Sequence, residues 1–159
     1  MGGREFAPRF SALNCALPAL LAFGHLAGYD DSEGSHLQLA IRLTTTCYLL
    51  ANQSESGLLP ELVSFRAQAQ SFAEESRVEP EHDFSSLRPG FAQSLFYVWL
   101  ATKNRQYIEW GWEQFLAIRA HARLHGENEV GFASVAHSRF GTTHGTPSFD
   151  STGAFPDNR

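Results

Sequence analysis

The chain has 159 residues, which is enough for one ordinary domain with a buried core. Its 43% hydrophobic residues, with 3 Trp and 13 Phe, exclude a disordered chain, because disorder requires low hydrophobicity and high charge. The net charge of −5, with basic residues scattered singly among acids, provides no basic patch for nucleic acid or anionic lipid.

No membrane span or leader is evident in the sequence. The longest apolar stretch, Cys15 to Phe23, is interrupted by Pro18 and is far shorter than the roughly 20 residues that a span requires. The N-terminal residues, Met1 to Phe6, contain no apolar run after a basic start. The sequence therefore predicts no transmembrane segment and shows no secretory signal.

The first third of the chain predicts a helical hairpin. Apolar residues at helical spacing predict a helix over residues 13–26, and a polar turn follows at 28–35. A second apolar stripe, with Ser35 as its N-cap, predicts a helix that continues to about residue 51. Residues 62–65 resemble a short strand. The polar stretch Arg66–Phe84 is predicted to be a candidate site loop, since loops beyond about 12–15 residues are uncommon unless functional or disordered.

The second half predicts another hairpin. Ser85 or Ser86 is a candidate cap and Pro89 suits the first turn of a helix that ends near Lys103. Asn104 then caps a fourth helix, which Gly126 closes. Residues 138–159 lose all periodicity and predict a loop or disordered tail, so the folded part is assigned to residues 1–137.

Few residues indicate chemistry by their own pattern. His121 and His125 have the spacing of two metal ligands on one helix face, but no third ligand accompanies them and Glu does not follow His121, so zinc is disfavoured. The sequence also lacks the glycine and serine motifs of acyl transfer, phosphate binding and hydride transfer. The pattern alone therefore supports none of these activities.

Two charged residues and two cysteines have unusual positions. Glu61 follows Pro60 at the head of an apolar stretch, and Arg88 precedes Pro89 at a helix start. Two interpretations of each residue remain open. One is a functional role, and the other is a simple salt bridge for Glu61 and an ordinary surface arginine for Arg88. Cys15 and Cys47 each lie in an apolar segment, where two buried thiols and a disulfide remain open alternatives.

Five ordered blocks of sequence extend through nearly all of the chain to about Val135. They are Leu13 to Pro18 with Leu20 to Gly24, Thr46-Cys47-Tyr48, Gly57 to Glu61, Leu87 to Glu113 and Gly131 to Val135. In this order they resemble class I α-mannosidases, glycoside hydrolase family 47, and five blocks with compatible gaps are far more specific than any one of them.

The resemblance implies a fold and a compartment. The family fold is a barrel of seven helical hairpins, so the expected fold class is all-α, with two hairpins forming part of an (αα)7 barrel as a middle fragment. The match of Cys15 and Cys47 to the family's cysteine pair implies a disulfide across the first hairpin. A secretory origin in the endoplasmic reticulum or Golgi follows, and the glycosylation sequon Asn52-Gln53-Ser54 is consistent with it.

The resemblance also identifies site positions. Family members hydrolyse terminal α-1,2-linked mannose of high-mannose N-glycans with inversion, which needs two carboxyl groups about 6.5–9.5 Å apart. Gly90 falls at the general-base position and Gln93 at a second carboxylate position, so no intact catalytic residue is expected in this chain. Ala12 falls at the position of an active-site His. Only Arg88 and Glu61 match sugar-contacting positions. The family binds calcium, and its site is not expected in this chain.

These observations lead to the hypothesis of an α-1,2-mannosidase family domain that is truncated and inactive on its own. The alternative is a catalytically dead module that binds mannose glycans or acts in glycoprotein quality control in the endoplasmic reticulum. A third possibility is a gene-model fragment of a normal enzyme. The expected partners are high-mannose N-glycans or glycoproteins, with no nucleic acid.

Overall fold

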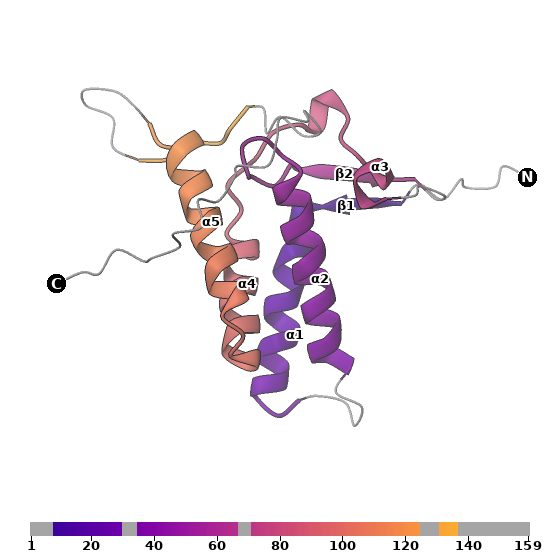
Figure 1. The fold of residues 1–159 in the computed structure, drawn as a ribbon, viewed down its shortest axis with the longest axis vertical. Helices are drawn as coiled ribbons and strands as arrows, with labels where there is room; N and C mark the ends of the chain where they lie inside the picture. The colour runs from indigo at the N-terminus through magenta and orange to yellow at the C-terminus, as the bar shows by residue number, and fades with distance from the viewer. Residues whose placement is uncertain (1–7, 30–34, 67–70, 125–130, 137–159) are drawn as a thin grey trace, which may run out of the picture.

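The computed structural model describes residues 8–29, 35–66, 71–124 and 131–136. Four helices form most of it, and they are α1 (Leu17–Leu26), α2 (Ser35–Asn52), α4 (Gly90–Thr102) and α5 (Gln106–His121). Figure 1 shows α1 and α2 as one antiparallel pair beside α4 and α5, and α1 packs against both α2 and α4. The two predicted helical hairpins are therefore confirmed.

A small antiparallel sheet lies at the end of the molecule where α1 begins (Figure 1). Its strands are β1 (Arg9–Ser11), β2 (Leu62–Phe65) and β3 (Ser76–Arg77), in the order β1-β2-β3. In the register, Phe10 is opposite Val63 and Phe65 is opposite Ser76. The strand-like stretch at 62–65 is confirmed, and the short sheet to which it belongs accompanies a fold that is mostly helical, as the all-α prediction expects.

The stretch Arg66–Phe84, which the sequence predicts to be a long loop, contains short elements of secondary structure. The short helix α3 (Phe72–Glu75) leads directly into β3, and a 3-10 turn follows at Pro80–His82. The Ser71 hydroxyl caps α3 by accepting from the Glu74 N–H. Elements of two to four residues are too short to produce a periodic pattern, which explains why the sequence did not reveal them.

Both hairpins begin differently from the prediction. Residues Ala12–Ala16 form a 3-10 helix and the α-helix starts at Leu17, with Pro18 in its first turn, where the missing N–H breaks no helical hydrogen bond. Neither Ser85 nor Ser86 caps α4, which begins at Gly90 after Pro89. The prediction of those serine caps is wrong.

The ends of α5 agree better with the sequence. The Asn104 side chain accepts from the Gln106 N–H at 3.0 Å, so the predicted cap is confirmed. The helix ends at His121, and the predicted closing residue Gly126 lies outside the described residues, as does the tail from 138 onward. Phe115 is 45% exposed and stacks on Trp112.

The core lies where the two hairpins meet. Tyr48 of α2 stacks on Trp110 of α5 with ring centroids 3.9 Å apart, which joins the two outer helices. Burial raises the pKa of Tyr48 to about 12, and a hydrogen bond to Glu113 adds to the shift. The central cluster consists of Cys15, Ala22, Ala40, Cys47, Ala51, Phe91, Leu95, Val98, Tyr107 and Trp110.

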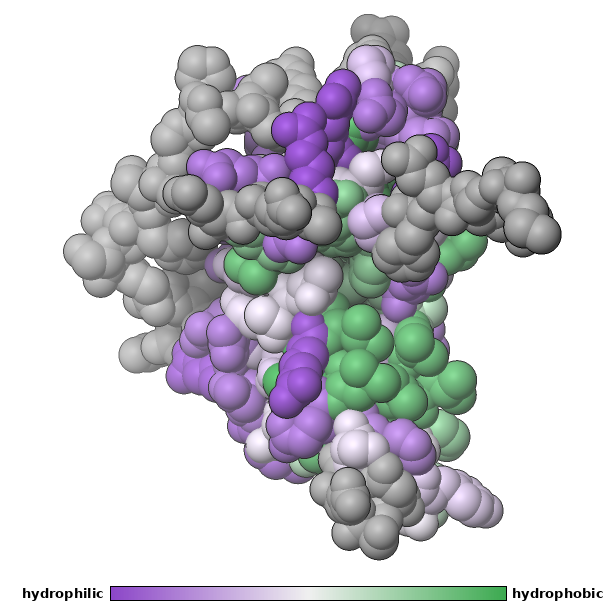
Figure 2. All heavy atoms as spheres, turned by 90° about the vertical axis from the view of Figure 1, so that its right-hand side faces the viewer, coloured by the Kyte–Doolittle hydropathy of each residue, from purple (hydrophilic) through white to green (hydrophobic). Residues whose placement is uncertain are grey.

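Part of the surface remains apolar. Figure 2 shows hydrophobic side chains gathered on one face of the molecule. Helix α1 alone exposes Leu17, Leu20, Phe23 and Leu26, each by more than 40%. Among the residues that the structure describes, none of the helices combines the length and the hydropathy that a bilayer crossing requires.

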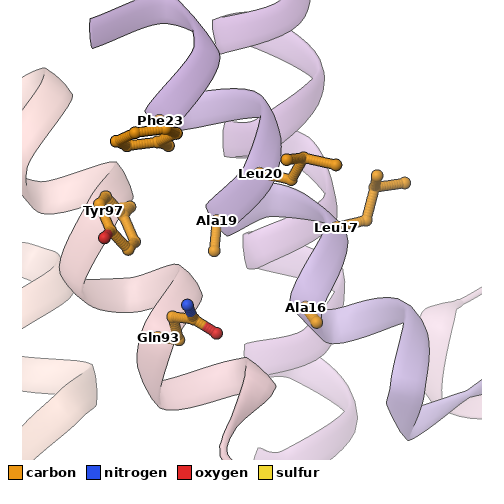
Figure 3. Close-up of a pocket in the computed structure, with 7 residues that line it drawn as sticks. All are labelled: Ala16, Leu17, Ala19, Leu20, Phe23, Gln93 and Tyr97. Carbon is orange, nitrogen blue, oxygen red and sulfur yellow. The ribbon is translucent and has the colours of Figure 1, made fainter. Parts of the chain in front are cut away.

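An open groove of about 390 Å³ runs between α1 and α4. In Figure 3, Phe23 of α1 and Tyr97 of α4 face each other, with ring centroids 5.6 Å apart, and Leu17 and Leu20 of α1 also line the groove. Gln93 lines the same groove one helical turn before Tyr97.

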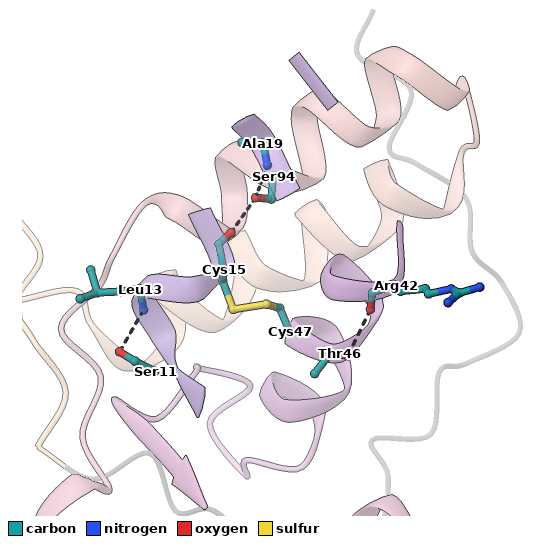
Figure 4. Close-up of a disulfide and its surroundings, with 8 residues drawn as sticks. All are labelled: Ser11, Leu13, Cys15, Ala19, Arg42, Thr46, Cys47 and Ser94. Atoms are coloured by element: carbon teal, nitrogen blue, oxygen red, sulfur yellow. Dashed lines mark hydrogen bonds between the residues drawn. A yellow bond between two sulfur atoms is a disulfide. The ribbon is translucent and has the colours of Figure 1, made fainter. Parts of the chain in front are cut away.

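A disulfide joins Cys15 and Cys47, with Cα atoms 6.0 Å apart (Figure 4). Both cysteines are fully buried, and they connect the 3-10 helix before α1 to the middle of α2. The disulfide that the family resemblance implied is thus confirmed, and the alternative of two free thiols is excluded.

The side chain of Ser94 connects α4 to the start of α1 (Figure 4). Its buried hydroxyl accepts from the Ala19 N–H at 3.0 Å and donates to the Cys15 carbonyl at 2.6 Å. The first N–H groups of a helix have no partner within that helix, and α1 has no side-chain cap of its own. Ser94 therefore caps α1 from the neighbouring helix.

We expect Ser94→Ala to lower the free energy of unfolding by about 1–3 kcal/mol, because it leaves a buried donor and a buried acceptor without partners. Denaturant unfolding measures the difference. Ser134→Ala, at an exposed position, is the matched control and should change little. An equal effect of the two substitutions would show that the Ser94 bonds contribute nothing.

Candidate functional site

Glu61 and Arg88 form a close ion pair beside the starts of β2 and α4. Arg88 Nε donates to Glu61 Oε1 at 2.8 Å and to Oε2 at 3.1 Å, and Nη2 donates to Oε1 as well. The Ser86 hydroxyl donates to Oε2 at 3.0 Å. The Glu61 side chain is 15% exposed and that of Arg88 37% exposed, so the pair lies at the surface with the carboxylate beneath the guanidinium. The structure thus brings together the two residues that the sequence identified as sugar contacts.

The backbone around the pair is closely held. The Glu61 N–H donates to the Phe84 carbonyl at 2.9 Å, and the Glu61 carbonyl accepts from the Ala12 N–H at 3.1 Å. Leu87, directly before Arg88, has a φ of 52°, a left-handed conformation that costs a non-glycine residue roughly 1–2 kcal/mol. This strained residue turns the chain between Ser86 and Arg88, so that both side chains reach Glu61.

The electrostatics fix both charges of the pair. The hydrogen bond from Arg88 lowers the pKa of Glu61, and the Ser86 hydroxyl and the charges of Arg88 and His82 act in the same direction, whereas burial opposes them. Glu61 in turn raises the pKa of Arg88. At neutral pH Glu61 is therefore a carboxylate that accepts hydrogen bonds and has no proton to donate.

We expect Glu61→Gln to destabilise the chain at pH 7 and to have a smaller effect in acid. The folded-state pKa of Glu61 lies below the unfolded value of roughly 4.3, so its stabilisation is present above that pH and is lost as the pH falls through the folded pKa. Thermal melting between pH 7 and pH 3 measures the difference. Glu109→Gln, which breaks the exposed pair with Arg105, is the control and should change little. A Glu61→Gln effect that is constant across this range would contradict the expectation.

Gly90 is buried at the first turn of α4 and lies against Ala16. A Cβ atom placed on Gly90 would lie 2.8 Å from the Ala16 Cβ and 3.1 Å from its Cα and backbone N. Real Cβ contacts essentially never come that close, so a side chain at position 90 requires the backbones to separate. Gly90 therefore allows α4 to approach the start of α1 closely.

We expect Gly90→Ala to destabilise the chain by about 1–3 kcal/mol through overpacking. Gly111, inside α5, is a matched control, because a Cβ there would meet nothing within 4 Å. Gly111→Ala should stabilise by roughly 0.5–1 kcal/mol, since alanine favours the helix over glycine. Chemical denaturation of both variants measures the two effects. A stabilising effect of Gly90→Ala would show that the contact with Ala16 leaves room for a side chain at position 90.

The other predicted positions lie around the same end of the hairpins. Ala12, at the position matched to a family His, is buried and donates its N–H to the Glu61 carbonyl. Gln93 is exposed on α4 and faces the groove. Ala12, Gly90 and Gln93 present no carboxylate and no imidazole, so Glu61 is the one carboxylate among the site positions that the sequence identified.

Groups of metal-ligating side chains are absent from the part of the chain that the structure describes. Within residues 8–29, 35–66, 71–124 and 131–136, no three His, Cys, Asp or Glu side chains gather to hold a metal ion. His125 of the His121/His125 spacing lies outside the described residues. None of the described residues is therefore assigned to the calcium ion that the resemblance implies.

The sequence did not identify Ser86 as a partner of Glu61 or Tyr97 as part of a groove. Ser86 had been assigned to a helix cap, although its position two residues before Arg88 is a signal for the same cluster. Tyr97 follows Gln93 by one helical turn, and this spacing on one helix face could have indicated a shared surface.

The fold is a domain of two helical hairpins, and three comparisons identify the family to which it belongs. The glycosyl hydrolase family 47 model matches residues 1–149. An endoplasmic reticulum mannosyl-oligosaccharide 1,2-alpha-mannosidase of Homo sapiens is 39% identical over 131 residues, covering 82% of this chain and 18% of that protein. The one from Schizosaccharomyces pombe is 30% identical over 140 residues, covering 80% and 26%. The chain thus belongs to glycosyl hydrolase family 47, and it spans about a fifth to a quarter of the length of these relatives.

A solved structure shows the same fold. The α-1,2-mannosidase from Trichoderma reesei superposes with a TM-score of 0.67 at 19% identity, covering 89% of this chain and 30% of that one. That enzyme is an (αα)7 barrel, so the two hairpins described above correspond to a part of such a barrel.

Proposed function

We propose that this chain is part of an α-1,2-mannosidase-type domain that recognises mannose residues of high-mannose N-glycans, and that on its own it does not cleave them. Family membership and the 1,2-alpha-mannosidase activity of the human and fission-yeast relatives support the substrate class. The names of those relatives also support a location in the secretory pathway. The observation that carries the proposal is the Glu61–Arg88 ion pair, which retains the two residues matched to sugar-contacting positions. Positions 90 and 93, in contrast, have no carboxylate.

The lack of turnover follows from the chemistry of these side chains. Inverting hydrolysis needs one carboxyl group that donates a proton and another that activates water. Gly90 has no side chain, and the amide of Gln93 is not a base at neutral pH. Glu61 is held as an anion by Arg88, so it cannot act as the acid, and its oxygens already accept from Arg88 and Ser86.

The geometry of Arg88 supports the proposed mannose recognition. The guanidinium has five N–H groups, and within the described part of the chain its bonds to Glu61 use Nε and Nη2. The N–H groups on Nη1 can donate to sugar hydroxyl oxygens. Glu61 orients the guanidinium for this contact, because a bidentate pair fixes the plane of the fork.

Binding of a fluorescently labelled high-mannose N-glycan, followed by anisotropy, tests the recognition. We expect Arg88→Ala to weaken binding by about 10-fold to 100-fold, which corresponds to a lost hydrogen bond to or from a charged group. Arg88→Lys should not restore it fully, because an ammonium lacks the planar fork. Glu109→Ala, in the exposed pair on α5, is the control with unchanged affinity. Equal affinity of the wild-type chain and Arg88→Ala would overturn the proposed role of the pair.

A further inference from the structure

We infer that Asn52 is an acceptor of an N-linked glycan and that it is modified before the end of α2 folds. Asn52-Gln53-Ser54 is the only Asn-x-Ser/Thr triplet in the 159 residues. Asn52 is the last residue of α2 and is exposed, so a glycan attached to its side chain extends into solvent. The inference rests on the part of the proposed function that sends the chain through the secretory pathway.

The serine of the triplet has the opposite environment. Ser54 is only 5% exposed, and its hydroxyl lies 2.9 Å from the hydroxyl of Ser56, with which it shares a hydrogen bond. The Ser56 hydroxyl also accepts from the Leu58 N–H at 3.2 Å. A transferase must reach the hydroxyl at position 54 together with the Asn52 amide, and in the folded chain that hydroxyl is covered.

The turn after α2 explains how the two residues of the triplet come to differ. The Gln53 N–H donates to the Leu49 carbonyl at 3.1 Å, and the Ser54 N–H donates to the Ala51 carbonyl at 3.0 Å, so the last helical turn tightens at its end. The Gln53 side chain also accepts from the Ser76 hydroxyl at 2.5 Å. These contacts hold the triplet closed after folding, which places the modification during or directly after synthesis.

The modification is a transfer of an oligosaccharide from a lipid-linked oligosaccharide diphosphate. The Asn52 Nδ2 atom forms a bond to the anomeric carbon of the sugar, the bond from that carbon to the diphosphate oxygen breaks, and the lipid diphosphate leaves. The amide loses one proton to a base of the transferase. No oxidant or reductant is consumed.

The test is translation of the full chain behind a cleavable secretory signal, in the presence of endoplasmic reticulum microsomes, with protease protection to verify that the chain is in the lumen. We expect one slower-migrating form that an endoglycosidase converts back. Asn52→Gln and Ser54→Ala should abolish it, and Ser54→Thr should retain it. Ser56→Ala removes the same hydroxyl pair but leaves the triplet intact, so it should be glycosylated like the wild-type chain.

The timing has its own measurement. Folded chain purified without glycan is offered to microsomal transferase and lipid-linked donor, with and without prior reduction and unfolding. We expect modification only of the unfolded chain. A luminal wild-type chain without glycan would overturn the inference while leaving the proposed mannose recognition untouched, because the supplied signal makes entry independent of it. Equal modification of the folded chain would overturn the proposed order of events.

Discussion

Breaking the Cys15–Cys47 disulfide should lower the free energy of unfolding by about 3–4 kcal/mol. The bond closes a segment with a sequence separation of 32 residues, and in the chain-entropy model a cross-link of that length removes this much conformational freedom from the unfolded chain. Since domains are typically stable by only about 5–15 kcal/mol, the loss is a large part of the total. Both cysteines lie in the central cluster, so the cross-link also fixes the start of α1 against α2.

The measurement compares denaturant unfolding of the oxidised chain with that of chain reduced in denaturant and refolded under reductant. This route is needed because both cysteines are fully buried and resist reduction in the folded chain. A Cys15→Ala/Cys47→Ala variant is the control, and its unfolding should not respond to reductant. Coincident curves for oxidised and reduced wild-type chain would contradict the expected contribution of the disulfide.

Putting carboxylates back at positions 90 and 93 should not produce turnover. A glutamate at position 90 meets Ala16 at its Cβ, so α4 must move away from α1 before the side chain can be accommodated. Glu61 remains a carboxylate with a lowered pKa, and a general acid would instead require a raised one. General acid–base groups contribute about 10² to 10⁴ each in rate, and none of the described site positions supplies the acid.

The Gly90→Glu/Gln93→Glu variant is expected to be less stable than the wild-type chain by about 1–3 kcal/mol and to release no mannose above background. Gln93→Glu alone, on the exposed face of α4, should fold like the wild type. Adding Ala16→Gly removes the nearest atom of the clash and should recover part of the stability without activity. Mannose release by this triple variant would show that an acid operates within the chain and would contradict the site description.

The helices were predictable because each has a continuous apolar stripe. Phe91, Leu95 and Val98 are spaced as one helix face and are all buried in the structure. No local pattern predicts that Glu61 and Arg88 lie close together, because 27 residues separate them. Both residues were identified only through the family motifs that contain them. The family resemblance therefore predicted the site positions and the barrel, and the periodicity predicted the helices.

Interactions between distant segments were not predictable. Ser94 bonds to backbone atoms 75 and 79 residues away, and a buried serine in a helix has no pattern that indicates such partners. The same is true of Gly90, whose contact with Ala16 depends on how closely two helices approach. The small residues Ala16, Ala19, Gly90 and Ser94 at this interface are what permits the approach, but their significance appears only once the helices are placed together.

The most direct test of the account is mannose release from a high-mannose N-glycan by the purified wild-type chain, with calcium present, alongside Arg88→Ala and Glu61→Ala. The account predicts no release above background by any of the three chains, and glycan binding by the wild type that is weakened in both variants. Release of mannose by the wild-type chain that disappears in Arg88→Ala or Glu61→Ala would contradict it, because other residues of the chain would then supply the two carboxyl groups.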